Sequence, residues 1–159
     1  MNDEKLKIST TTDGQPPRPG FETASAPAPI NPATGQHAAY WVLTEAERKK
    51  GFVRPVRDTY RHVGIRPKHP LRDLTPEEKE RYSDYVKFEQ YPEGSRCIGR
   101  YWTEPELSSG CGQTTTMGRA LAETWAADLR YYGSTFCAYC GRHISVDEFE
   151  WLDGQRLGT

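Results

Sequence analysis

The sequence predicts a small α+β domain, and three observations support this class. Apolar residues recur every four positions over 116–130, which is the spacing of one buried helix face. From Phe136 onward the chain is expected to form β-structure, with a tight hairpin turn at Asp153-Gly154. Two short segments place a cysteine directly before a glycine, at 111–112 and at 140–141. This third feature suggests that a bound metal holds the domain together.

The length of 159 residues suits one domain of ordinary size. Only 35% of the residues are apolar, which indicates that part of the chain does not pack into a core. Residues 1–38 contain a stretch rich in Thr, Pro, Ala and Gly, and we expect them to form a disordered tail. The folded domain is then expected to span 39–159.

The chain shows no signal for a membrane or for secretion. No run of about 18 apolar residues is present, which excludes a transmembrane helix. The first residues lack the apolar core of a secretory signal. We therefore expect a cytoplasmic protein, in a compartment where thiols stay reduced. Four cysteines in that compartment are better explained as metal ligands than as disulfides.

Three capping boxes mark helix starts, each a Thr followed three residues later by Glu. They predict a helix over 45–50, a second helix over 76–89 and a short helical turn after Thr103. Residues 52–63 are expected to be extended. Because proline cannot donate to a β-ladder, Pro55 restricts this segment to an edge or bulged strand.

The cysteine spacing points to zinc. Structural Zn²⁺ takes four tetrahedral thiolate or imidazole ligands, often two from each of two tight turns. Cys137-Ala-Tyr-Cys140-Gly141 fits one complete turn, in which the glycine adopts the positive φ that the bend requires. Cys111-Gly112 fits the second half of another turn, but position 108 is Ser and offers no ligand. The sequence thus predicts a zinc-ribbon-like site with one ligand still to be found.

The missing ligand must come from elsewhere in the chain. His62 and Cys97 are equally good candidates by spacing alone, and His69 and His143 are weaker ones. A catalytic zinc would need an open coordination position and a nearby general base. Neither Glu123 nor Glu148 has the spacing to a ligand that such motifs show. The sequence therefore favours a closed structural site, and we assign no catalytic residues.

From Tyr40 onward the chain resembles a family of small bacteriophage and prophage proteins. The similarity is carried by YWVLTEAERKKGFVRPVRDTYRHVG, by CGQTTTMGRALAETWAADLRYYGSTFCAYCGRH and by a final FEW. In shorter relatives the His and the Cys-Gly pair lie close together. The resemblance therefore implies that 65–110 is an insertion, which we expect to be helical, and it favours His62 over Cys97. It implies a metal-binding fold and a viral origin, but no activity.

Basic residues cluster between 48 and 72, where nine Lys or Arg stand against the single acid Asp58. Such a block could form a face that binds phosphates or an acidic partner. Alternatively, its charges are simply solvated or paired with Glu residues of the 76–89 helix. The candidate partner-binding residues are Lys49, Lys50, Arg54, Arg57, Arg61, Arg66 and Lys68.

These features together predict a zinc-stabilised, non-catalytic binding protein. We expect a phage-type accessory protein that engages a host protein or nucleic acid through its basic face. A metal-dependent nuclease or hydrolase is an alternative, although no clustered carboxylates suited to Mg²⁺ are evident. A component of the virion or of its assembly is a further alternative, in which the tail serves as a tether.

Overall fold

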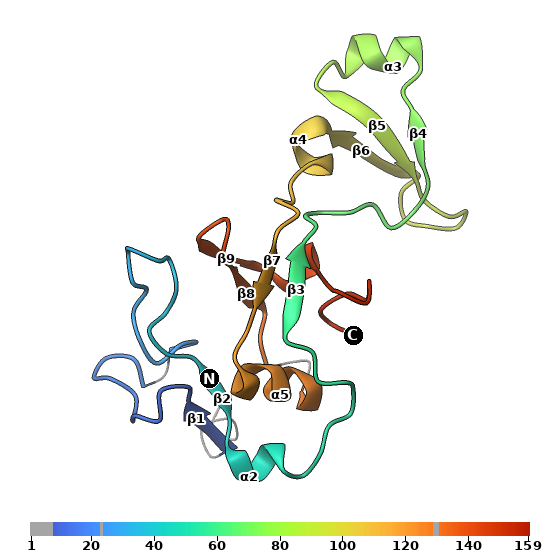
Figure 1. Ribbon diagram of the computed structural model, residues 1–159. Coiled ribbons are helices and arrows are strands. Elements are labelled where there is room, and N and C mark those ends of the chain that lie inside the picture. Colours follow the sequence, from blue (N-terminus) through green and yellow to red (C-terminus); the bar gives the residue numbers. More distant parts are fainter. Residues whose placement is uncertain (1–7, 23, 129–130) are drawn as a thin grey trace.

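The computed structural model describes residues 8–22, 24–128 and 131–159. Within these ranges the chain forms four small antiparallel sheets and four short α-helices, which confirms the predicted mixture of α and β structure. Figure 1 shows two parts. We call residues 65–110 the lobe and the rest of the described chain the body. No described helix is long and apolar enough to cross a membrane.

The body is built around a three-stranded sheet. Its strand order is β10 (Phe149–Trp151), β3 (Thr59–His62) and β7 (Thr114–Thr116). Along β3 the side chains of Tyr60 and His62 are buried while Arg61 is exposed, as the two-residue period of a strand requires. The prediction of an edge strand here is wrong, because β3 pairs on both sides. Pro55 does not interfere, since it lies before the strand begins.

One helix lies at the end of this sheet and packs its Trp125 against Trp151 of β10 (Figure 1). Helix α5 (Arg119–Ala127) starts three residues later than expected, because Thr114–Thr116 belong to β7. Gly118 takes the N-cap position, without a side-chain cap. The buried face of α5 includes Trp125, as the four-residue spacing predicted. Residues 129–130, at the end of the predicted helix, lie outside the described residues.

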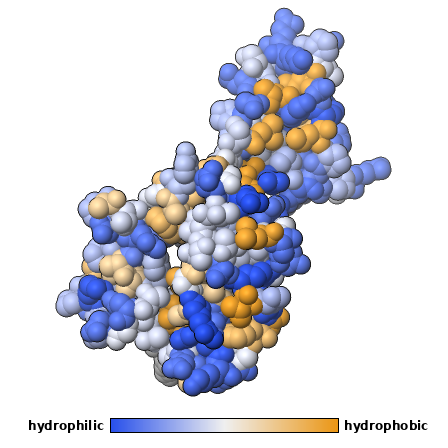
Figure 2. All heavy atoms as spheres, viewed as in Figure 1, coloured by the Kyte–Doolittle hydropathy of each residue, from blue (hydrophilic) through white to orange (hydrophobic). Residues whose placement is uncertain are grey.

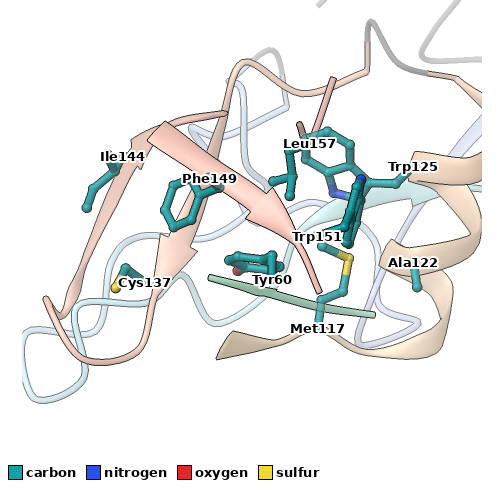
Figure 3. Packing of buried hydrophobic residues seen from close by; sticks show 9 residues of the cluster. All are labelled: Tyr60, Met117, Ala122, Trp125, Cys137, Ile144, Phe149, Trp151 and Leu157. Carbon is teal, nitrogen blue, oxygen red and sulfur yellow. The ribbon is translucent and has the colours of Figure 1, made fainter. Parts of the chain in front are cut away.

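The core of the body is dominated by aromatic rings (Figure 3). Tyr60 meets Phe149 edge to face at 5.2 Å between ring centroids. Trp125 meets Trp151 in the same way at 6.0 Å. The expected turn at Asp153-Gly154 is present, with the Trp151 N–H donating to the Gln155 carbonyl at 2.8 Å. Large rings of this kind bury more apolar area per residue than aliphatic side chains, which suits a small core.

Residues 8–22 and 24–38 make specific contacts with the rest of the body, whereas a disordered tail was expected. Strand β1 (Ser9–Thr11) pairs with β2 (Trp41–Leu43), which leads into α2 (Glu45–Arg48). The indole N–H of Trp41 donates to the Ala24 carbonyl at 3.0 Å, and Ala28 is fully buried. Small side chains add little apolar area individually, so composition alone did not indicate this packing. Residues 1–7 of the predicted tail lie outside the described residues.

A second hairpin completes the body beside the central sheet. Strands β8 (Ser134–Cys137) and β9 (Arg142–Ser145) are joined by the tight turn around Cys140. The 3-10 turn η1 (Val146–Glu148) then leads into β10. Phe149 of β10 and Cys137 of β8 both belong to the aromatic core.

The lobe combines a three-stranded sheet with two short helices, so the expectation of a helical insertion is corrected. Its strands are β4 (Leu71–Asp73), β5 (Tyr85–Gln90) and β6 (Gly99–Thr103), and its helices are α3 (Pro76–Arg81) and α4 (Glu104–Leu107). The capping box at Thr75 does start α3, but the helix ends at Arg81 and Tyr85 already belongs to β5. A capping box indicates where a helix begins and carries no information about its length.

The two ends of the lobe meet where it joins the body. Gly64 has φ +79°, and a Cβ added there would collide with the backbone of Ser109 and Gly110. A Cβ on Gly110 would in turn collide with the Val63 backbone. The Ile65 N–H also donates to the Ser109 hydroxyl at 2.8 Å. The chain therefore leaves the body and returns to it at a single point. Only glycine, which has no Cβ, allows the two segments to approach each other so closely there.

Replacing Gly64 by Ala is expected to destabilise the protein by more than the cost of a positive φ alone. That cost is about 1–2 kcal/mol for a residue with a Cβ, and displacement of the Gly110 backbone adds to it. Gly94→Ala is the matched control, because Gly94 has φ +89° and open space around it. Urea unfolding of both variants measures the difference. Equal losses of stability in the two variants would contradict the close contact.

Candidate metal centre

Four side chains from distant parts of the sequence converge beside the core of the body. They are His62, Cys111, Cys137 and Cys140, and one potential ligand atom of each lies within 4.8 Å of all the others. His62 and Cys137 are buried, and Cys111 and Cys140 are half-buried. This group of one imidazole and three thiols could hold a metal ion. The set agrees with the residues expected from the sequence.

Two glycine turns bring the cysteines into place. Gly112 has φ +75° and donates its N–H to the His62 carbonyl at 2.8 Å, which fixes Cys111 beside the end of β3. Gly141 has φ +68° and donates its N–H to the Cys137 carbonyl at 2.8 Å, which closes the turn between β8 and β9. Left-handed backbone at both positions is what the Cys-Gly pairs predicted.

The imidazole of His62 is held from its far side. Its Nε2 lies 3.1 Å from a carboxylate oxygen of Glu148. A carboxylate can only accept, so Nε2 carries the proton and donates to Glu148. The other nitrogen, Nδ1, is then unprotonated; it accepts from the Cys111 backbone N–H at 3.3 Å and lies 3.6 Å from Sγ of Cys140. A carboxylate behind a histidine in this way fixes the tautomer and orientation of a metal ligand.

The sulfur atoms are close together but not bonded. Sγ of Cys111 and Sγ of Cys137 are 3.6 Å apart, and all three thiols of the group are free. Burial, together with the sulfur atoms of Cys137 and Cys111, raises the pKa of the Cys140 thiol to about 12. Burial would also raise the pKa of Cys137, but hydrogen bonds from the Cys140 backbone and the neighbouring thiols lower it. Three thiolates can share so small a space only if a cation balances their charge.

The other candidate ligands lie elsewhere. Cys97 is exposed in the lobe and is not part of the group. His143 has its Nε2 2.8 Å from the Tyr40 hydroxyl, and His69 packs edge to face against Tyr91. The structure thus brings His62 to the three cysteines and leaves the alternatives outside.

Neither carboxylate considered as a catalytic base is placed for that role. Glu123 is engaged by Arg48 at 2.8 Å on α5. Glu148 contacts the far nitrogen of His62, where it can orient the ring but cannot reach an atom bound between the sulfurs. Sequence reasoning missed this supporting role of Glu148. Its position eight residues after Cys140 corresponds to no recognised motif, and its contact with His62 forms only because η1 folds back beside β3.

The predicted basic face is largely neutralised within the protein. Lys49 pairs with Glu45 at 3.2 Å, and Lys50 pairs with Glu47 at 2.7 Å. Arg54 donates to the Trp125 carbonyl at 2.6 Å. These three side chains therefore support α2 and α5, and they are not gathered into one binding surface.

The remaining basic residues divide into two groups. Arg57 is tied to the C-terminal turn by Asp153 at 3.1 Å and lies over the Trp151 ring. Arg66 approaches Glu150 only to 3.9 Å. In the described chain, Arg61 and Lys68 are exposed and have no acidic partner. Of the seven candidate residues, Arg61, Arg66 and Lys68 are thus exposed without a close acidic partner among the described residues, and Arg54 has only a neutral carbonyl as its partner.

Comparison with known proteins adds no assignment: no protein-family model, curated protein or solved structure matches this chain. The resemblance to phage and prophage proteins therefore stays a prediction.

Removing the carboxylate behind His62 is expected to weaken metal binding. Glu148→Ala leaves the imidazole without its orienting acceptor, and loss of such a partner lowers metal affinity by about 10–100-fold. Asp147→Ala is the control, because that neighbouring carboxylate contacts no member of the group. Titration with Co²⁺ in competition with a chelator measures both affinities. An unchanged affinity in Glu148→Ala would show that the hydrogen bond does not support the site.

Proposed function

We propose that the protein is a non-catalytic binding protein whose fold is held by one structural zinc ion. The observation that carries this proposal is the convergence of four ligand atoms, all from side chains that zinc prefers. Four side-chain ligands would complete the tetrahedral coordination of a structural zinc ion, which would leave no position for water or substrate. A site of this composition stabilises a fold and does not perform hydrolysis.

The spacing of the ligand atoms supports zinc. Metal–sulfur bonds of about 2.3 Å in a tetrahedron place two sulfurs about 3.8 Å apart, and a sulfur and an imidazole nitrogen about 3.6 Å apart. Two of the distances here match: 3.6 Å between the sulfurs of Cys111 and Cys137, and 3.6 Å between Sγ of Cys140 and Nδ1 of His62; all four ligand atoms lie within 4.8 Å of one another, so a bound ion would draw the widest pairs closer. The pattern of two glycine-containing turns is also that of a zinc ribbon, with His62 in place of one cysteine.

We propose nucleic acid as the partner of this binding protein. The support comes from exposed cationic side chains that remain unpaired in the described chain, such as Arg61 and Lys68. Lysine and arginine side chains bind phosphates by displacing counterions, and their number sets the salt dependence of binding. The earlier alternative of a nuclease has less support, because the metal group contains no carboxylate ligand of the kind that Mg²⁺ prefers.

The purified protein is expected to contain one zinc ion per chain. His62→Ala and Cys140→Ser should lose the metal and unfold the body, because structural zinc contributes about 10–16 kcal/mol of apparent binding free energy in small domains. Cys97→Ser is the matched control and should retain metal and stability, since Cys97 is exposed outside the group. Elemental analysis and thermal melts with and without chelator measure these effects. If the Cys140→Ser variant retains zinc, the proposed set of four ligands is contradicted.

Binding to single-stranded DNA is expected to weaken steeply as salt increases. The plot of log affinity against log salt should have a negative slope of about 0.7 for each phosphate contacted. Fluorescence anisotropy with a labelled oligothymidylate measures this slope on the zinc-loaded protein. The nucleic-acid part of the proposal fails if no binding is seen even at low salt.

A further inference from the structure

A cleft of about 510 Å³ lies where the lobe meets the body. Figures 1 and 2 show these two parts joined at a narrow waist. The lobe contributes the segment after Ile65 together with residues of β5 and β6, and the body contributes η1 and the C-terminal turn. A volume of this size is in the range of sites that bind small organic molecules. No single stretch of sequence forms the cleft, so it could not be predicted from spacing.

The cleft gathers four cationic side chains from three separate segments. They are Arg66, Lys68, Arg100 and Arg156. Within the described chain, Lys68 and Arg156 have no acidic partner, and Arg66 reaches Glu150 only at 3.9 Å. Arg100 is paired with Glu106 and lies 3.9 Å above the Trp102 ring. Two full positive charges and part of a third are therefore available to a ligand.

The carboxylates of the cleft are mostly committed to internal hydrogen bonds. Glu89 is buried and accepts from the backbone N–H groups of Lys68 and His69 at 3.1 Å each, and from the Trp102 indole N–H at 2.9 Å. Glu148 accepts from His62. Such hydrogen bonds stabilise a carboxylate and occupy its acceptor positions, although its charge remains. The groups of the cleft with hydrogen-bonding capacity left for a ligand are thus mainly the cationic ones, with Asp147 as the exception among the lining carboxylates.

Aromatic rings lie next to these charges. Tyr91 lines the cleft, is half-buried and meets His69 edge to face at 5.4 Å. Trp102 lies deeper in the cleft, beneath Arg100. A flat ring beside lysine and arginine side chains is the combination by which proteins hold single-stranded nucleic acids, with bases stacked on rings and phosphates on cations.

We propose that this cleft binds one nucleotide unit of a single strand, with its phosphate held by Lys68 and Arg156 and its base against Tyr91. The inference rests on the proposed function and locates the proposed nucleic-acid binding in this cleft. It moves the binding surface away from the end of α2, where Lys49 and Lys50 are already paired. It also adds Arg156 and Tyr91, which lie outside the basic block of residues 48–72.

The test compares a cleft variant with a matched surface variant in the full zinc-loaded protein. Lys68→Ala/Arg156→Ala should bind labelled oligothymidylate roughly tenfold more weakly, as expected for the loss of two solvent-exposed ion pairs. Its salt slope should become shallower by about 1.4. Lys49→Ala/Lys50→Ala removes the same charge from α2 and should leave affinity and slope unchanged. Zinc content and melting temperature confirm that both variants remain folded.

The role of the ring is tested separately. Tyr91→Ala should weaken binding roughly tenfold, because stacking of one base contributes about 1–3 kcal/mol, whereas Tyr91→Phe should bind like the wild type. If Tyr91→Ala binds normally, no base is held against this ring and the proposal is overturned. An equal loss in Tyr91→Phe would also overturn it, because the hydroxyl and not the ring would then make the contact.

Competition identifies the source of the nucleotide. Thymidine 5′-monophosphate should displace the labelled oligonucleotide only weakly at equal nucleotide concentration. If it displaces the label as well as unlabelled oligothymidylate does, the cleft binds a free nucleotide, and the proposal of a single-stranded ligand is overturned. If polyglutamate displaces the label as effectively as unlabelled oligothymidylate does, the partner is an acidic protein, and the proposal of a nucleotide ligand is overturned. If the wild type binds but only the α2 variant loses affinity, the cleft is wrong while the proposed function stands. Absence of binding by the wild type overturns both.

Discussion

Three sulfur atoms and one imidazole nitrogen share a space only 4.8 Å across, and this crowding is the constraint on which the body depends. The group spans 78 residues of sequence between His62 and Cys140. It connects the end of β3 and the turn before β7, which belong to the central sheet, with the β8–β9 hairpin, which forms a separate sheet. The ring of Phe149 lies 5.0 Å from that of His62, so the aromatic core begins directly beside the ligands. The positions of these four side chains and the packing of the aromatic core therefore depend on each other.

Local chemistry was the part of this structure that the sequence predicted well. The two Cys-Gly turns depend on positive φ at the glycine, and the capping boxes depend on hydrogen bonds three residues apart, so both are decided by neighbours along the chain. The length of α3 was misjudged because Tyr85 could serve a helix stripe or a strand equally well. Its role as a strand residue is decided by pairing with β6, opposite Thr103, which no local pattern contains.

Long-range arrangement decided the features that the sequence did not predict. The orienting carboxylate of Glu148 and the cations around the cleft come from segments up to 90 residues apart, between Arg66 and Arg156. A block of positive charge is easily recognised in a sequence, but whether each charge is free depends on acids brought beside it by folding. Lys50 and Lys68 are indistinguishable by composition, yet only Lys50 has its charge compensated by a neighbouring Glu.

The meeting of Gly64 and Gly110 has a consequence for how this protein can vary. Because the lobe leaves and rejoins the body at one point, its length enters the stability of the body only through loop-closure entropy. That cost grows logarithmically, by about 0.6 kcal/mol for each doubling of length. A segment of almost any size could be accommodated at this junction without moving any of the four side chains that converge beside the core. The body can thus act as a constant frame while the lobe, and with it the wall of the cleft, is exchanged or enlarged over evolutionary time.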